Sequence, residues 1–250
     1  MRVDQKNQSN LYNIVSNIIQ KIQKLGDSAL IEFVNKFDSK KINKIEELFI
    51  PKDVLKNAYN SLKKEEKQAL KIAAKRIKKF HTHQIPIDLK YKDNMEIKLG
   101  LKHSPIVSAG FYVPGGKAIY PSSVLMNAIP AMLAGVNRIV IANPVRGKDQ
   151  SAAVLYAAKK CGVKEIYRVG GAQAIATLAY GTKTIKRVDK IVGPGNIYVA
   201  AAKKIVFGEV GIDMIACPSE ITVVADKSSN VKWVTADLIG QAEHDINAQC

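Results

Sequence analysis

The first hundred residues carry apolar side chains at steps of three and four, the spacing of one face of an α-helix. Residues 11–25 show this pattern, and Gly26 is expected to end their helix. Asp27 can cap a second helix that extends to Phe37. A third helix is predicted over residues 51–80, with lysines along its outer face. The spacing therefore predicts a helical N-terminal segment.

From about residue 105 the pattern changes to short β-rich runs that alternate with helical stretches. Strands are predicted at residues 138–142, 165–169, 188–192 and 221–225, and helices at 122–134, 151–161, 172–180 and 230–244. This alternation is typical of a parallel sheet with helices on its faces. We predict an α/β fold in which N-terminal helices precede the sheet.

Three glycine clusters fall just beyond the carboxyl ends of strands, where parallel sheets bind their ligands. They are Pro114-Gly115-Gly116, Gly170-Gly171-Ala172-Gln173 and Gly193-Pro194-Gly195-Asn196. Glycine lets backbone N–H groups approach a ligand, and a helix N-terminus favours an anion such as a pyrophosphate. None of the clusters matches GxGxxG, so each glycine could equally serve only a tight turn. Two amide-bearing turns in successive units, with Gln173 and Asn196, favour a nucleotide site.

The last predicted helix carries two side chains that can bind a metal ion. Gln241 and His244 are three residues apart and share a helix face, whereas Glu243 lies elsewhere. Imidazole is a common zinc ligand and a glutamine oxygen is a rarer one. A complete site needs about four ligands, so at least two must come from other segments. The alternative is a histidine near a helix end with a purely structural role.

The chain is basic, with 38 Lys and Arg against 22 Asp and Glu. The lysines are spread along the chain with few aromatic neighbours, so we expect a solvated surface and not a nucleic-acid interface. Cys161, Cys217 and Cys250 form no CxxC pair, which favours a reducing compartment. We expect no signal peptide and no membrane span, and therefore a cytoplasmic protein.

Six motifs occur in order along the chain and carry a specific resemblance. They are Gly110-Phe111-Tyr112-Val113-Pro114-Gly115-Gly116, Pro121-Ser122-Ser123-Val124-Leu125-Met126, Val169-Gly170-Gly171-Ala172-Gln173-Ala174-Ile175-Ala176, Asp189-Lys190-Ile191-Val192-Gly193-Pro194-Gly195-Asn196, Pro218-Ser219-Glu220 and Gln241-Ala242-Glu243-His244-Asp245. The N-terminal runs Gly26-Asp27-Ser28-Ala29-Leu30 and Lys36-Phe37-Asp38 add to it. Together they resemble the N-terminal portion of the histidinol dehydrogenase family.

The resemblance implies an enzyme that oxidises L-histidinol to L-histidine, the last steps of histidine biosynthesis. Two successive hydride transfers to NAD proceed through a bound histidinaldehyde, in a homodimer with one zinc ion per active site. The resemblance assigns NAD contacts to Tyr112, Gln173 and Asn196 and a substrate contact to Ser219. It also assigns zinc binding and substrate contact to Gln241 and His244. In the family the metal mainly orients the substrate.

The family fold implied is two incomplete Rossmann-like domains. Residues 112–219 would form an inserted NAD-binding domain, and residues 1–111 with 220–250 an interrupted first domain. The family's acid–base Glu–His pair and its remaining Asp and His zinc ligands are expected beyond Cys250, so we expect this chain alone not to turn over histidinol. Cys217 stands where the family more often has Gly, and its side chain could crowd the substrate loop.

Three other interpretations of the chain stay open at this point. It could be a non-catalytic NAD-binding or dimerising remnant of the same family, or a different alcohol or aldehyde dehydrogenase. A nucleic-acid binder would show a steep dependence of affinity on salt, which we do not expect.

Overall fold

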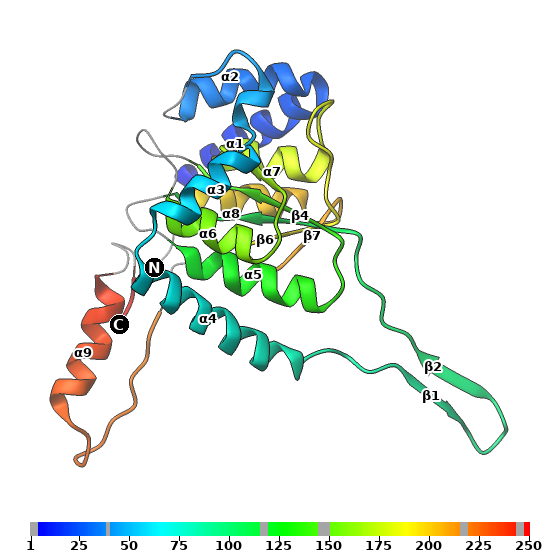
Figure 1. The fold of residues 1–250 in the computed structure, drawn as a ribbon, viewed down its shortest axis with the longest axis vertical. Helices are drawn as coiled ribbons and strands as arrows, with labels where there is room; N and C mark the ends of the chain where they lie inside the picture. The colour runs from blue at the N-terminus through cyan, green and yellow to red at the C-terminus, as the bar shows by residue number, and fades with distance from the viewer. Residues whose placement is uncertain (1–4, 39–40, 116–119, 145–150, 216–219, 244–247) are drawn as a thin grey trace. The chain divides into compact units, whose positions relative to one another are not determined.

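The computed structural model describes residues 5–38, 41–115, 120–144, 151–215, 220–243 and 248–250 (Figure 1). The chain divides into two compact units, Met1–Ile215 and Ala216–Cys250. The helices of the first unit are α1 (Gln5–Leu25), α2 (Asp27–Phe37), a 3-10 turn η1 (Ile45–Leu48), α3 (Lys52–Ser61), α4 (Lys64–Thr82), α5 (Pro121–Leu133), α6 (Ala152–Lys160), α7 (Gly171–Tyr180) and α8 (Ile197–Val206).

A five-stranded parallel sheet forms the centre of this unit. Its strands are β3 (Ser108–Tyr112), β4 (Arg138–Ala142), β5 (Glu165–Tyr167), β6 (Lys190–Val192) and β7 (Gly211–Ile212), in the spatial order β5-β4-β3-β6-β7. The chain moves outward from β3 to β5 and then returns to the other side of β3. This order is that of a Rossmann-like sheet without its sixth strand, and it creates a switch point beside β3. The predicted α/β fold is confirmed.

Two hydrophobic cores pack against opposite faces of the sheet. Helices α7 and α8 cover one face and α5 and α6 cover the other (Figure 1). In β3 the alternation of side chains serves both cores, since Phe111 belongs to one and Tyr112 to the other. The N-terminal helices form outer layers, because α1 packs on α7 and α8, α3 on α6, and α4 on α5.

The single helix predicted over residues 51–80 is in fact two helices, α3 and α4. Leu62 and Lys63 between them are extended. The backbone N–H of Lys63 donates to the Glu66 carboxylate at 2.9 Å, so Glu66 caps the start of α4. The prediction of one helix was wrong because the apolar spacing continues across this break.

The prediction of a purely helical N-terminal segment was also wrong at an antiparallel hairpin, β1 (Leu89–Lys92) and β2 (Lys98–Leu101). Its register pairs Leu89 with Leu101 and Tyr91 with Leu99, so four apolar side chains share one face. Each of these four is between 42% and 56% exposed. The hairpin forms a sheet of its own, and we call it the apolar hairpin.

Three strands differ between the prediction and the structure. Residues 221–225 do not form the predicted strand; the described backbone there has only an isolated bridge, Glu220 with Gln249. A strand needs a neighbour along its length, and this segment has none among the described residues. Strands β3 and β7 were not predicted. The expected domain boundary between residues 111 and 112 falls inside β3.

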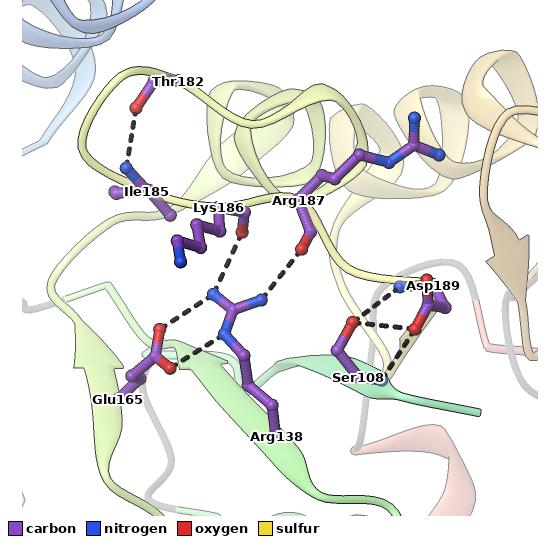
Figure 2. Close-up of polar contacts among 8 residues, drawn as sticks. All are labelled: Ser108, Arg138, Glu165, Thr182, Ile185, Lys186, Arg187 and Asp189. Carbon is purple, nitrogen blue, oxygen red and sulfur yellow. Dashed lines mark hydrogen bonds and ion pairs between the residues drawn. The ribbon is translucent and has the colours of Figure 1, made fainter. Parts of the chain in front are cut away.

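Polar contacts hold the amino ends of the strands together (Figure 2). Arg138, the first residue of β4, makes two hydrogen bonds of 2.8 Å to the Glu165 carboxylate at the start of β5. Its guanidinium also donates to the backbone oxygens of Lys186 and Arg187. The Ser108 N–H and hydroxyl both donate to Asp189 at 2.7 and 2.9 Å. All of these contacts lie at the amino ends of the strands, and none of them involves a residue at the carboxyl ends.

The second unit contains helix α9 (Val231–Ala242), which Asn230 caps through the N–H of Lys232. None of the residues described in this unit is buried. Over the described ranges of both units, no helix has the length and apolar character that crossing a bilayer requires.

Candidate dinucleotide site

A cavity of about 620 Å³ lies at the carboxyl edge of the sheet. Its walls come from the loops after β3, β4, β5 and β6 and from α1 and the end of α2. The lining residues are Ile14, Ile18, Lys36, Phe37, Asp38, Tyr112, Pro114, Gly115, Pro144, Gly170, Gly171, Ala172, Gln173, Asn196 and Tyr198. The volume lies within the range of small-molecule and cofactor sites. All three residues that the sequence predicted to contact NAD are therefore at one cavity.

Tyr112 is the last residue of β3, and its side chain is buried. Its hydroxyl accepts a hydrogen bond from the backbone N–H of Gly171 at 3.1 Å. Gly171 has a positive φ of 65°, a conformation that glycine adopts without strain. Tyr112 therefore ties the end of the central strand to the start of α7.

Gln173 lies in the first turn of α7 and is 2% exposed. Its Nε2 donates to Oδ2 of Asp38 at 3.4 Å, a long contact. Asp38 caps the C-terminal end of α2 and also accepts a backbone hydrogen bond from Gly170. Burial raises the pKa of Asp38, and the hydrogen bonds from Gln173 and Gly170 partly oppose that shift. A partly desolvated carboxylate thus stands at the cavity, held by the predicted amide.

Asn196 is the N-cap residue of α8. Its Oδ1 accepts from the N–H groups of Tyr198 and Val199, both at 3.1 Å. Asn196 is exposed and lines the cavity. The cap uses the side-chain oxygen, so the amide nitrogen is the atom with which Asn196 can donate to a ligand.

The glycine turns suggested that the N–H groups at the starts of α7 and α8 are open to an anion, but several of these groups are already hydrogen-bonded within the chain. The Gly171 N–H at α7 already donates to Tyr112, and the Tyr198 and Val199 N–H groups at α8 donate to Asn196. These three amides have partners inside the chain. A ligand in the cavity must therefore rely on side chains and on other backbone groups more than on these N–H groups.

Two of the glycines permit loops to touch each other. A Cβ at Gly115 would lie 1.9 Å from the Pro144 oxygen, and one at Gly193 would lie 2.1 Å from the Tyr112 oxygen. Gly193 also has a φ of 116°. At these two positions glycine serves close packing of backbone on backbone, the structural alternative considered from the sequence.

A charged pair that was not predicted from the sequence fixes the turn before Asn196. Lys203 on α8 is 2% exposed, and its Nζ donates to the Gly193 oxygen at 3.0 Å and to the Asp213 carboxylate. Asp213 accepts in turn from the Gly193 N–H at 2.8 Å. A lysine among the alanines and valines of α8 was the available signal, because a buried lysine needs a partner.

The predicted zinc and substrate residues are described only in part. Gln241 lies in the last turn of α9, which ends at Ala242, and the cap residue Glu243 still has right-handed helical dihedrals. His244, Ser219 and Cys217 lie outside the described residues. Within the described ranges no group of three or more His, Cys, Asp and Glu side chains could hold a metal ion. The pairing of Gln241 with His244 stays a prediction.

The sequence model of the histidinol dehydrogenase family matches residues 1–250. The chain belongs to the histidinol dehydrogenase family. A curated histidinol dehydrogenase from Pelagibacter ubique is 52% identical over 249 residues, which are 98% of this chain and 56% of that protein. One from Nitrosomonas europaea is 48% identical over 241 residues, 96% of this chain and 56% of that protein.

A crystal structure of histidinol dehydrogenase from Elizabethkingia anophelis has the same architecture, with a TM-score of 0.89 at 40% identity. It is matched over 96% of this chain and 55% of its own length. The chain thus spans about half the length of the histidinol dehydrogenases it matches. The resemblance inferred from the six motifs, to the N-terminal portion of the family, is confirmed.

Proposed function

We propose that residues 1–250 form the NAD-binding portion of a histidinol dehydrogenase, with the five-stranded sheet from Ser108 to Ile212 at the centre of the cofactor domain. The proposed reaction is oxidation of L-histidinol to L-histidine through histidinaldehyde, with two NAD as hydride acceptors. NAD supplies the hydride acceptor, and the chain's residues hold and orient it.

One observation carries this proposal. Tyr112, Gln173 and Asn196 stand at the ends of three different strands or on the helices that follow, yet all three line one cavity. That cavity lies beside the switch point of the sheet, where Rossmann-like folds bind dinucleotides. The Lys203–Asp213 pair fixes the Gly193 turn that precedes Asn196, so the site is preorganised on that side.

Calorimetric titration of the chain with NAD tests the proposal. We expect one NAD per chain, and we expect Asn196→Ala to weaken binding about tenfold through loss of a donor and of the α8 cap. Asn230→Ala, which removes the equivalent cap from α9, is the matched control and should leave NAD affinity unchanged. Absence of NAD binding by a folded wild-type chain would contradict the proposal.

Zinc and the acid–base chemistry form a second part of the proposal. Gln241 and His244 would supply a glutamine oxygen and an imidazole nitrogen, about half of a four-ligand zinc site, and Ser219 would contact the substrate. The remaining ligands and the catalytic base would come from outside residues 1–250. We therefore expect no NADH from the chain with histidinol and NAD, and restored NADH formation in a protein extended to the length of its relatives.

We also propose a homodimer in which the apolar hairpin is covered by a second copy of the chain. An isolated two-stranded hairpin is marginal in water, and its apolar face of Leu89, Tyr91, Leu99 and Leu101 is half-exposed. Light scattering should give a dimer mass, and Leu99→Lys should shift it to monomer. Lys98→Glu, on the opposite face, is the control. A monomeric wild-type chain would contradict the proposed dimer.

The alternative interpretation is a non-catalytic NAD-binding remnant of the same family. If it is right, a protein extended to the length of its relatives should bind NAD but should neither bind zinc nor form NADH. Metal analysis of the extended protein separates the two, since the enzyme requires bound zinc.

A further inference from the structure

A second cavity, of about 550 Å³, lies among the helices that cover one face of the sheet. It is bounded by the middle of α4, the last turn of α5 and the end of α6, and α4 packs beside α5 (Figure 1). None of its lining residues lines the dinucleotide cavity. Its volume is within the range of small-molecule sites. We call it the lysine-lined cavity, after the side chains described below.

The interior of the lysine-lined cavity is apolar because α4 carries a small side chain where α5 carries large ones. Ala74 of α4 lines the cavity together with Ile129 and Met132 of α5. An alanine fills little space, and no residue of α4 is buried, so α4 does not close over the surface of α5. Met132 is 47% exposed as a result. An alkyl chain placed here would cover apolar surface that now faces water.

Four cations line the same cavity, and among the described residues no carboxylate does so. They are Lys71, Lys75, Lys78 and Lys160, and none of them forms an ion pair with a described residue. Lys75 lies one helical turn from both Lys71 and Lys78, and like charges at this spacing repel. The C-terminal ends of α5 and α6 each carry roughly half a negative charge, which offsets about one of the four cations. The cavity therefore keeps a positive charge that an anion would neutralise.

The two kinds of lining suit the two ends of one molecule. A lysine lays its alkyl stem along apolar surface and keeps its ammonium group in water, so the charges stand at the mouth and the apolar surface lies inside. Cys161 lines the interior and is buried, and burial raises the pKa of its thiol to about 11. The thiol is therefore neutral and adds to the apolar lining without acting as a nucleophile. The lining fits a ligand that binds without covalent attachment.

We propose that the lysine-lined cavity binds an amphiphilic anion, an alkyl chain of medium length with a carboxylate or phosphate head group. The chain lies against Ala74, Ile129 and Met132, and the lysines of α4 hold the head group. Each ammonium group has three donors on a flexible stem, so the site accepts either head group. This inference does not depend on NAD binding, because the two cavities share no residue.

Calorimetric titration of the chain with decanoate, below the concentration at which it forms micelles, tests the inference. We expect saturable binding of decanoate and of decyl phosphate. Decyltrimethylammonium has the same alkyl chain with a positive head group, and it should bind at least about tenfold more weakly. Acetate has the charge without the chain and should show no saturable binding. Absence of decanoate binding by the folded chain, or equal affinity for decanoate and decyltrimethylammonium, would overturn the inference.

Variants of α4 test the two parts of the lining separately. Lys71→Gln combined with Lys75→Gln should weaken decanoate binding about fivefold, because each exposed charge contributes modestly. Lys64→Gln combined with Lys79→Gln is the control, since it removes two charges from exposed positions of the same helix outside the cavity. Ala74→Phe fills the cavity and should abolish saturable binding while circular dichroism stays that of the wild type. If that variant does not fold, the lysine pairs decide, and equal weakening by both pairs would refute the inference.

A decanoate that carries a diazirine locates the bound chain by photo-cross-linking and peptide mapping. We expect labels in α4 and α5, whereas labels confined to α1 or α2 would place the ligand in the dinucleotide cavity and refute the inference. A protein extended to the length of its relatives should retain decanoate binding; its loss would mean that the rest of the protein covers the cavity. Binding to anionic phospholipid vesicles without binding of free decanoate would make α4 a membrane-surface helix, and the inference would then be wrong.

Discussion

Helices α7 and α9 are both apolar in sequence, and both carry a glutamine predicted to bind a ligand. Eight of the ten residues of α7 are buried, whereas none of α9 is. Helix α7 lies between the sheet and α1, so every face has a neighbour. Trp233 and Ile239 of α9 are 73% and 58% exposed. The contrast teaches that an apolar helix becomes core only when other elements supply the opposing surfaces.

The largest expected loss of stability comes from the Gly193 turn, which packs against the end of β3 at Tyr112. Gly193→Ala places a Cβ 2.1 Å from the Tyr112 oxygen at a φ of 116°, so backbone must move. We expect a loss of about 4 kcal/mol or more in the free energy of unfolding, measured by circular dichroism in denaturant. The fluorescence of Trp233, the protein's one tryptophan, reports on α9 and should hardly change. Gly208→Ala, with a φ of 105° but nothing within 4 Å, is the control for strain alone and should lose less.

A matched pair of truncations measures the contrast directly. Ile175 of α7 is 0% exposed, so Ile175→Ala should cost about 2–5 kcal/mol of unfolding free energy. Ile239→Ala on α9 should cost less than about 0.5 kcal/mol because its side chain is mostly exposed. Denaturant titrations of both variants give the values. Equal losses would mean that α9 is covered in solution.

A smaller effect is expected from pH at the start of α7. Burial raises the pKa of Asp38 above its ordinary value of 3.8, so the folded state favours the neutral acid more than the unfolded state does. The contribution of Asp38 to the free energy of unfolding should therefore fall as pH rises from below 3.8 through the raised pKa. Asp38→Asn does not titrate, so its melting temperature relative to wild type should rise over the same interval. A constant difference from acid to neutral pH would contradict the assignment.

The last prediction concerns thiol reactivity, which leaves the fold unchanged, at two cysteines, one in each unit. Burial raises the pKa of Cys161 to about 11, so at pH 8 only about one thiol in a thousand is ionised. Cys250, in the unit of α9, is exposed. Peptide mapping after iodoacetamide treatment should show Cys250 alkylated at least about a hundredfold faster. Similar rates would show that the Cys161 region opens readily.

The alternation of strands and helices predicted the fold class and a parallel sheet with helices on its faces, because buried parallel strands have a local apolar signature; the Rossmann-like character of the sheet was implied by the family resemblance. Central strand β3 was missed because Ser108, Ala109 and Gly110 give it a weak β pattern. The apolar hairpin has a period-two pattern, Leu89-Lys90-Tyr91-Lys92. It was not predicted because the pattern is only four residues long and follows a long segment with helical spacing.

The part of the candidate site that lies just beyond the ends of strands could be predicted from the sequence. Tyr112, Gln173 and Asn196 lie there, and all three line one cavity. Asp38 could not be placed in the same way. Its contact with Gln173 spans 135 positions, and it depends on how α2 packs against α7. The Lys203–Asp213 contact depends likewise on the turn between α8 and β7. The lysine within apolar α8 indicates that it needs a partner, but no local pattern identifies which residue that partner is.

The Arg138–Glu165 and Ser108–Asp189 contacts fasten the strands at the edge opposite the cavity. Alignment of the strands is therefore secured without help from most of the loops that meet the ligand. Residues of those loops can be substituted, in evolution or by protein design, while the sheet beneath them keeps its structure. The amino ends of the strands therefore maintain the fold, while new binding specificities can evolve at the carboxyl ends.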